Sequence, residues 1–383
     1  MTNKKQEVYE KSGEEFSIGA LLPLSGEASA YGRWIREALE LGKEEINTTG
    51  GIQGKKLEII YEDDSANPKK ASLAQKKLSQ KYKIPVVFGS WVSSCVTAQI
   101  PIARRTKTVV LAEAIAPKLK RTGGYMFTIQ PRAEYYIKKL VPFVYFDLNI
   151  RRVSILYVDN DFGIAQANIF QTIFENLGGK IISKAAFRQG ETNFKGMLKK
   201  IKKENPQAIF IPAYTEVIPL IKQAKKLNVP AKFLASVPFE NPEIITKLGK
   251  LAEGVVYPYH YVSDPKNPVN KNFIKNYKMK YGREPEGFAA LAYEGIHIIA
   301  KALRNWDQKD KESLKNEFYG IHYFGPTGET VFDEEGYPIK KIVIKTVKNG
   351  KFVKISEIRE KLYSRFIGKP ISSYDSEIYH LQE

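Results

Sequence analysis

Small side chains that can hydrogen-bond follow a short apolar run in the first third of the chain. The run Pro85–Phe88 ends in Gly89, and Ser93 and Ser94 then open a predicted helix. Free backbone N–H groups at a helix start favour an anion, and a serine hydroxyl can donate a further hydrogen bond. These residues could therefore bind an anion at the start of the helix. The alternative is that both serines only cap the helix.

A second apolar run, Thr108–Ala112, ends in the loop Glu113–Pro117, which contains Ala114 and Ile115. Two buried parallel strands that each end in a polar loop fit this pattern. In open α/β sheets, ligands bind where the carboxyl ends of strands meet the amino ends of helices. We therefore expect a pocket at these two loops.

The residue patterns of an enzyme are missing from the sequence. Cys95 has no histidine near it in sequence, and it is more often a packing residue than a nucleophile in such a position. The single cysteine excludes internal disulfides and a cysteine-cluster metal site. The glycines of Gly50–Gly54 open no helix, so they do not form a phosphate loop. We expect no catalytic residue, no metal and no cofactor; the histidines are too scattered for a metal signature (His260, His297, His322, His380).

The acidic pair Asp63-Asp64 follows a predicted strand, Leu57–Tyr61, and precedes a helix that begins at Pro68. This position predicts that the pair ends the strand and caps the helix. Metal or acid chemistry is the alternative for two adjacent carboxylates.

Composition indicates a water-soluble globular chain with two domains. The 383 residues are 43% hydrophobic and 27% charged, and no apolar run approaches the length of a membrane span. The net charge of +18 could serve nucleic acid or an anionic membrane, but most lysines stand beside glutamates and predict solvated helix faces, so we expect no nucleic-acid partner. The amino end carries no apolar segment of a signal peptide, so the chain is either cytoplasmic or a mature form without its export segment.

Strand and helix patterns alternate along the chain in two sets. The first set starts at Phe16–Leu22, and the second starts at Arg152–Val158 with the loop that contains Phe162. Such alternation requires parallel sheets with right-handed crossovers. The fold class is α/β, with two doubly wound parallel-sheet lobes. A strand-turn-strand segment, 340–354, is expected to cap the units or to cross between them, and a closing helix is expected at Ser356–Phe366.

Several stretches resemble the periplasmic solute-binding proteins of branched-chain amino acid ABC transporters. They are LLPLSGEASAYG, INTTGGIQGKKLEIIYEDD, VVFGSWVSS, LAEAIAPKL and FGPTGETVFDEEG. The resemblance implies a type I periplasmic binding protein whose two lobes are joined by a three-strand hinge. Lobe 1 is then 15-131 plus 262-336, and lobe 2 is 132-261 plus 337-366, with flexible tails at 1-14 and 367-383.

The resemblance also implies a function. A small organic ligand is held in the cleft between the lobes, outside the cytoplasm, and is delivered to a membrane ABC permease by a monomeric protein. A sensory or regulatory binding protein of the same fold is the alternative, and a doubly wound enzyme is a third hypothesis.

By resemblance, particular residues line the ligand site. Ser93 stands where the family uses a serine hydroxyl on the ligand carboxylate, with Ser94 beside it. Aromatic positions of the family correspond to Tyr31, Tyr214 and Phe288, and Phe162 replaces a frequent tyrosine. Trp91 resembles an aromatic residue of the urea- and amide-binding branch. Each of these side chains has a structural alternative as a core residue or a helix cap.

Three departures from the family pattern bear on the ligand. Ile115 stands where amino-acid binders have a threonine, and Val237 stands where they hold the ligand ammonium with an acidic residue, with Glu240 three residues later. Glu113 enters the second loop, where it either faces the ligand or is a solvated carboxylate. We therefore expect a ligand other than an ordinary α-amino acid: an amide, a urea-like compound, an amine, or an apolar or aromatic acid.

Overall fold

Two compact units make up the chain in the computed structural model, which describes residues 15–115 and 124–355. One comprises Met1–Gln130 and Asp264–Pro338, and the other Pro131–Ser263 and Ile339–Glu383. The chain therefore passes between the units after Gln130, Ser263 and Pro338. The predicted tails at 1-14 and 367-383 and the predicted closing helix lie outside the described residues.

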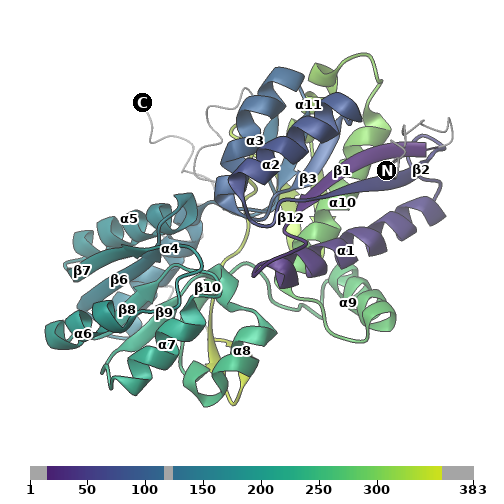
Figure 1. The fold of residues 1–383 in the computed structure, drawn as a ribbon. Coiled ribbons are helices and arrows are strands. Elements are labelled where there is room, and N and C mark those ends of the chain that lie inside the picture. The colour runs from purple at the N-terminus through teal and green to yellow at the C-terminus, as the bar shows by residue number, and fades with distance from the viewer. Residues whose placement is uncertain (1–14, 116–123, 356–383) are drawn as a thin grey trace, which may run out of the picture. The chain divides into compact units, whose positions relative to one another are not determined.

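A five-stranded parallel sheet forms the centre of the first unit, in the order β2-β1-β3-β4-β5 (Figure 1). Its strands are β1 (Glu15–Leu22), β2 (Lys56–Asp63), β3 (Val86–Gly89), β4 (Val109–Ala112) and β5 (Met126–Thr128). The chain leaves β1 for β2 at one edge and then returns past β1 to β3 and β4. Right-handed crossovers then place the first helix on one face and the next two on the other.

Five helices cover the sheet of the first unit. The helix α1 packs against α10 on one face, and α2 packs against α3 on the other. The bounds are α1 (Ser29–Thr48), α2 (Pro68–Lys76), α3 (Ser93–Thr106), α10 (Gly287–Asn305) and α11 (Lys311–Tyr319), with α9 (Pro268–Tyr281) beside α1. A π-helical turn, Lys77–Lys81, continues α2. The short hairpin of β11 (His322–Gly325) and β12 (Gly328–Val331) belongs to the same unit.

The second unit contains a seven-stranded sheet in the order β14-β13-β10-β9-β8-β6-β7. Its parallel strands are β6 (Arg152–Val158), β7 (Lys180–Phe187), β8 (Ala208–Ile211), β9 (Lys232–Ala235) and β10 (Val256–Tyr259). The antiparallel hairpin of β13 (Val343–Lys348) and β14 (Lys351–Lys354) extends the sheet beyond β10. The chain crosses between the units after Pro338, just before this hairpin, as predicted for the segment, and the hairpin itself pairs with the sheet of the second unit.

Helices cover both faces of this sheet as well. Figure 1 shows α4 and α5 on one side and α6, α7 and α8 on the other. They are α4 (Ala133–Pro142), α5 (Asp161–Asn176), α6 (Lys195–Glu204), α7 (Val217–Lys226) and α8 (Pro242–Leu248). The predicted fold class, two doubly wound α/β units, is confirmed by both sheets.

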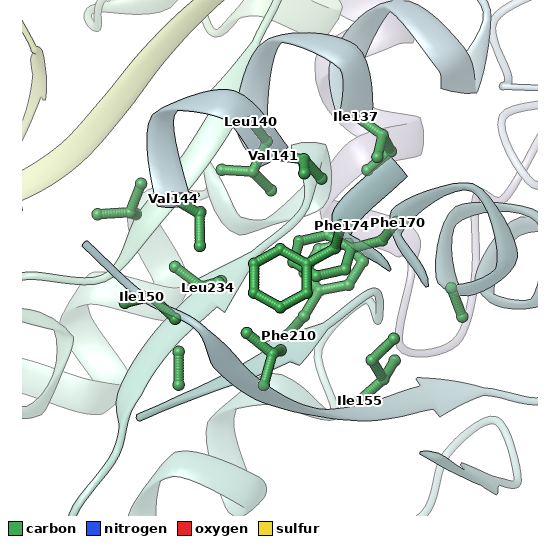
Figure 2. Close-up of a cluster of buried hydrophobic side chains, with 14 of the residues drawn as sticks. Ile137, Leu140, Val141, Val144, Ile150, Ile155, Phe170, Phe174, Phe210 and Leu234 are labelled. Atoms are coloured by element: carbon green, nitrogen blue, oxygen red, sulfur yellow. The ribbon is translucent and has the colours of Figure 1, made fainter. Parts of the chain in front are cut away.

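A cluster of apolar side chains lies between the sheet of the second unit and the pair α4 and α5 (Figure 2). Phe170 and Phe174 of α5 meet Phe210 of β8, and Leu140 of α4 and Leu234 of β9 complete the contact. The Phe170 and Phe210 rings stack with their centroids 4.4 Å apart. This core holds the strands whose carboxyl ends carry the loops described below.

Asparagine followed by proline begins three of the helices. The side chains of Asn67, Asn241 and Asn267 each accept a hydrogen bond from the backbone two residues later, at 3.0, 2.8 and 2.9 Å. The following proline fixes the first helical residue and needs no hydrogen-bond acceptor. This local chemistry starts α2, α8 and α9.

Candidate ligand-binding site

The turn from β3 into α3 is fixed by buried hydrogen bonds. Gly89 has φ +102°, and a Cβ there would lie 2.0 Å from the carbonyl oxygen of Leu21, so only glycine fits. A cis peptide bond joins Gly89 to Ser90. The Ser90 hydroxyl donates to Asp64 Oδ2 at 2.5 Å, and the Ser90 N–H donates to Gln99 Oε1 at 3.1 Å. These contacts position the residues between Gly89 and the start of α3.

Ser93 is buried at the first position of α3, and its hydroxyl donates to the carbonyl oxygen of Ile115 at 2.8 Å. This bond joins the loops that follow β3 and β4, as the sequence pattern predicted for these two stretches. The residue that precedes the helix is Val92, whose side chain makes no cap, so the alternative that Ser93 or Ser94 is the capping residue is wrong. Ser94 is half-buried. The Ser93 hydroxyl already donates its hydrogen bond to the Ile115 carbonyl. Its oxygen can therefore only accept a hydrogen bond from a further partner.

Three predicted aromatic residues come together in the first unit. The rings of Tyr31 and Trp91 stack with centroids 4.0 Å apart, and Phe288 meets both edge-on, at 5.5 and 5.6 Å. All three are buried. They come from α1, the β3–α3 turn and the first turn of α10, so they gather at the carboxyl edge of the sheet. We refer to Tyr31, Trp91 and Phe288 as the aromatic triad.

Glu113 is the first residue of the loop that follows β4. Its N–H donates to the Ser90 carbonyl at 3.1 Å, and its carbonyl accepts from Gln130 Nε2 at 3.1 Å. The side chain is fully buried, and neither carboxyl oxygen has a hydrogen-bond partner. Burial raises the pKa of this carboxyl well above 4.5. The alternative of a solvated loop carboxylate is therefore wrong.

The other two residues of the second loop are also buried. Ala114 uses its carbonyl to accept from Thr128 Oγ1 at 2.7 Å, and the Ile115 carbonyl is taken by Ser93. Ile115 carries no hydroxyl, so this position offers a ligand only apolar surface. The backbone carbonyls of the loop are thus used within the unit.

The second unit has a smaller aromatic group at the carboxyl edge of its sheet. Phe162 of α5 and Tyr214, which follows β8, stack with centroids 4.9 Å apart. The Tyr214 N–H donates to Glu216 Oε2 at 3.0 Å, which fixes the turn into α7. Val237 follows β9 in a short 3₁₀ turn and is buried. Phe162, Tyr214 and Val237 follow β6, β8 and β9, so all three lie at the carboxyl edge of this sheet.

Glu240 is committed to a partner within the second unit. One carboxyl oxygen lies 2.5 Å from Lys345 Nζ of β13, and the other accepts from the Tyr257 hydroxyl at 2.8 Å. Tyr257 and Lys345 are register partners across β10 and β13, so both side chains converge on the same carboxyl group. Burial raises the pKa of Glu240, although the charge of Lys345 opposes this shift. By the family resemblance, Val237 stands where an acidic residue holds the ligand. Because Glu240 is paired within the unit, it does not take over that position.

Sequence reasoning missed the amide pair that supports the site. Gln99 Nε2 donates to Gln75 Oε1 at 3.0 Å, so α2 and α3 are joined beneath the Ser90 turn. Gln99 lies six residues after Ser93 on α3, away from its face of the helix, so the spacing gave no signal of a buried polar pair. Cys95 is buried, and burial raises the pKa of its thiol, which leaves it the packing residue that was predicted. Among the described residues, no group of acidic, histidine and cysteine side chains is arranged to hold a metal ion, and no helix is long and apolar enough to cross a bilayer.

Asp64 predicts a measurable pH dependence of stability. Burial raises its pKa from 3.8 to about 6, so between these values the folded state holds a proton that the unfolded state has lost. The contribution of Asp64 to the free energy of unfolding therefore falls as pH rises from about 4 to about 7. The fall is about 3 kcal/mol, because the pKa is raised by about two units. The variant Asp64→Asn should lack this slope. Urea unfolding followed by tryptophan fluorescence at pH 4 and pH 7 measures the difference between the two proteins.

Asp63 is expected to affect the pH dependence of stability in the opposite direction to Asp64. Burial alone would raise its pKa, but hydrogen bonds from Ser25, Ser65 and Leu24 hold it below 3.8. Its contribution is therefore present at neutral pH and is lost as pH falls through the folded-state value. A parallel pH dependence in wild type and Asp64→Asn would contradict the prediction for Asp64.

Comparison with known proteins identifies the fold family. A family model described as periplasmic binding protein matches residues 15–351. This chain belongs to that family. The family consists of non-enzymatic solute-binding proteins of ABC transporters, in agreement with the absence of a catalytic pattern in the sequence.

Relatives in this family include amino-acid binders. The chain is 26% identical over 336 residues to a leucine-, isoleucine-, valine-, threonine- and alanine-binding protein of Pseudomonas aeruginosa, covering 86% of this chain and 88% of the relative. A leucine-binding protein from Thermotoga maritima is 27% identical, with a TM-score of 0.84 over 89% of this chain and 97% of the other. A branched-chain amino acid substrate-binding protein from Streptococcus pneumoniae, solved with isoleucine, is 26% identical, with a TM-score of 0.81 over 89% of this chain and all of the other. The family resemblance drawn from the sequence is confirmed.

Proposed function

We propose that this chain is the extracytoplasmic solute-binding protein of an ABC transporter and that its ligand is not an ordinary α-amino acid. The ligand is a small organic molecule that contacts Ser93 and the aromatic triad at the carboxyl edge of the first sheet. The protein works as a monomer and delivers the ligand to a membrane permease. Phe162 and Tyr214 of the second unit are proposed as further ligand contacts.

The observation that carries the ligand proposal is the pairing of Glu240. By the family resemblance, an acidic residue after β9 holds the ammonium group of an amino acid, and Val237 stands at that position. The nearby Glu240 is bound to Lys345 and Tyr257, so it is not available for the same purpose. An ammonium group buried against Val237 would lose its hydration without gaining a partner, which costs several kcal/mol. Amides, urea-like compounds, amines, and apolar or aromatic acids remain as candidate ligands.

A thermal-shift screen at neutral pH tests this proposal. A ligand at one hundred times its Kd stabilises the folded state by about 2.7 kcal/mol and should raise Tm by several degrees. We expect at least one amide, urea, amine or aromatic acid to do so, and leucine, isoleucine and valine to have little effect. A large shift with any branched-chain amino acid would show that the departures at Ile115 and Val237 have been misinterpreted.

Replacing Ser93 tests its contact with the ligand that the screen finds. Ser93→Ala should raise the Kd about tenfold, the value of one hydrogen bond. The matched control is Ser79→Ala, because Ser79 is a buried serine of the same unit that donates to the backbone carbonyl of Gln75 at 2.6 Å. Equal ligand affinity in wild type and Ser93→Ala would remove Ser93 from the site.

A further inference from the structure

Glu113 is the one buried carboxyl group at the carboxyl edge of the first sheet for which the described structure provides no partner. Asp64 at the same edge accepts from Ser90, and the buried Glu294 of α10 accepts from the hydroxyls of Thr327 and Thr330. Glu113 has two oxygens that accept nothing. A buried carboxyl group without hydrogen bonds costs free energy, and natural proteins rarely keep one without a use.

Backbone hydrogen bonds show where Glu113 lies in the first unit. Glu113 directly follows β4, and its N–H donates to the carbonyl of Ser90, the residue before Trp91, at 3.1 Å. Two residues further on, the Ile115 carbonyl accepts from the Ser93 hydroxyl at 2.8 Å. A Cβ at Gly295 of α10 would lie 3.5 Å from Leu111 Cδ2, so α10 packs on the end of β4 that leads to this loop.

The aromatic triad lies at the carboxyl edge of the same sheet. Phe288 precedes Gly295 by seven residues on α10, which places both on one side of the helix and about 10 Å apart along it. Gly295 packs at the level of Leu111, and Phe288 packs on Tyr31 and Trp91. The backbone of Glu113 is thus bonded to the residue before Trp91 of the triad, and its loop is bonded to Ser93.

We propose that Glu113 is the anchor for a ligand that carries a protonated amine or amidine group, and that this group donates N–H bonds to the two free carboxyl oxygens. This inference rests on the proposed function and narrows its ligand class to an N–H cation. Other groups near Glu113 would also favour a cation. Ser93 offers an oxygen lone pair, and aromatic faces attract cations. Neither oxygen of the Glu113 carboxyl group has a hydrogen-bond partner among the described residues, so both can accept from a ligand.

Binding of such a ligand is expected to release protons. Burial disfavours the charged form and raises the pKa of Glu113 well above 4.5, so the free protein holds more proton at this carboxyl group than an exposed glutamate does. When the cation binds, the carboxyl group loses that proton to solvent and the carboxylate pairs with the ligand ammonium. Charge and atoms balance, since one proton leaves for each cation bound.

Matched pairs of compounds test the proposal at pH 7. Benzylamine is compared with benzoate, benzamidine with benzamide, and isobutylamine with isobutyrate, by thermal shift and calorimetry. We expect the N–H cation of at least one pair to bind at least tenfold tighter than its partner, and benzyltrimethylammonium, a cation without N–H groups, to bind more weakly than benzylamine. Calorimetry in phosphate and in Tris should show up to one proton released per cation bound.

The variant Glu113→Gln keeps the shape of the side chain and removes the charge. It should lose at least tenfold in affinity for the cation and release no proton on binding, whereas the control Glu294→Gln should keep both properties. Proton release by wild type provides the test if Glu113→Gln does not fold. If only neutral or anionic compounds bind, or if the cation binds without proton release, the inference is overturned and the proposed function stands. If nothing in the wider screen binds, both are overturned.

Discussion

Replacing Lys345 with methionine is expected to lower the free energy of unfolding of the second unit by about 3–5 kcal/mol. The side chains of Lys345 and Glu240 are only 9% and 11% exposed, and their charged atoms are 2.5 Å apart. Methionine fills a similar volume but leaves Glu240 buried beside Tyr257 without a positive charge. Removing one partner of a buried ion pair is costly because the other charge has already lost its hydration. Urea unfolding followed by far-UV circular dichroism measures the loss.

The double variant Lys345→Met/Glu240→Gln separates the charge effect from packing. Glutamine at position 240 can still accept from the Tyr257 hydroxyl and carries no charge, so most of the lost stability should return. In Lys345→Met alone, the pKa of Glu240 should rise further, and the loss should be larger at pH 8 than at pH 5 because the folded state then holds a proton that the unfolded state gives up. A single variant as stable as wild type at pH 8 would contradict the assignment of this pair.

The Glu240–Lys345 pair also illustrates what the sequence could not show. The carboxylate follows β9 at the place where a ligand anchor was sought, but its partner lies 105 residues later in a hairpin of unknown register. Strand pairing sets that register, and Tyr257 faces Lys345 only because β13 runs antiparallel to β10. Periodicity along one strand carries no information on such a pairing.

Parallel strands were the part of the fold that the sequence predicted best. Arg152–Val158 has the same bounds in the structure as in the sequence prediction, because short apolar runs between polar loops are typical of buried parallel strands. Two short helices, α8 and α11, were not predicted, although Asn241 and Asp310 accept hydrogen bonds from the backbone at their starts. These two capping residues were the available signal in the sequence for the starts of α8 and α11.

The meeting of the two loops after β3 and β4 was predictable from the sequence, and the chemistry of their side chains was less so. Apolar runs and loop composition indicated that the turns after β3 and β4 would meet, and the bond from Ser93 to Ile115 shows that they do. The burial of Glu113 was not predictable, because the side chain of a residue that directly follows a strand can face either solvent or the core. The Ser93 hydroxyl donates within the protein, and the two Glu113 oxygens have no hydrogen-bond partner. These two side chains therefore offer hydrogen-bond acceptors, where the sequence suggested a donor. The family pattern alone would have suggested a site for a carboxylate.

Phe210→Ala is expected to lower the free energy of unfolding of the second unit by about 3–5 kcal/mol. Phe210 is completely buried between the sheet and α5, where it stacks on Phe170 (Figure 2). Alanine removes the ring from a core that α4 and α5 cannot close without moving the strands, so a cavity remains. Phe210→Leu keeps most of the volume and should cost less than about 1.5 kcal/mol. The exposed Leu73, replaced by alanine, should change stability by no more than about 0.5 kcal/mol.

The positions of the tryptophans make this variant a test of coupling between the two units. Trp34, Trp91 and Trp306 all belong to the first unit, whereas Phe210 belongs to the second. Tryptophan fluorescence therefore reports unfolding of the first unit, and far-UV circular dichroism reports both. If the units unfold as one cooperative body, Phe210→Ala shifts both transitions equally. If each unit is stabilised by its own core, the fluorescence transition stays at the wild-type urea concentration while part of the dichroism signal moves to lower urea. An unchanged dichroism transition would contradict the role of Phe210 in the core.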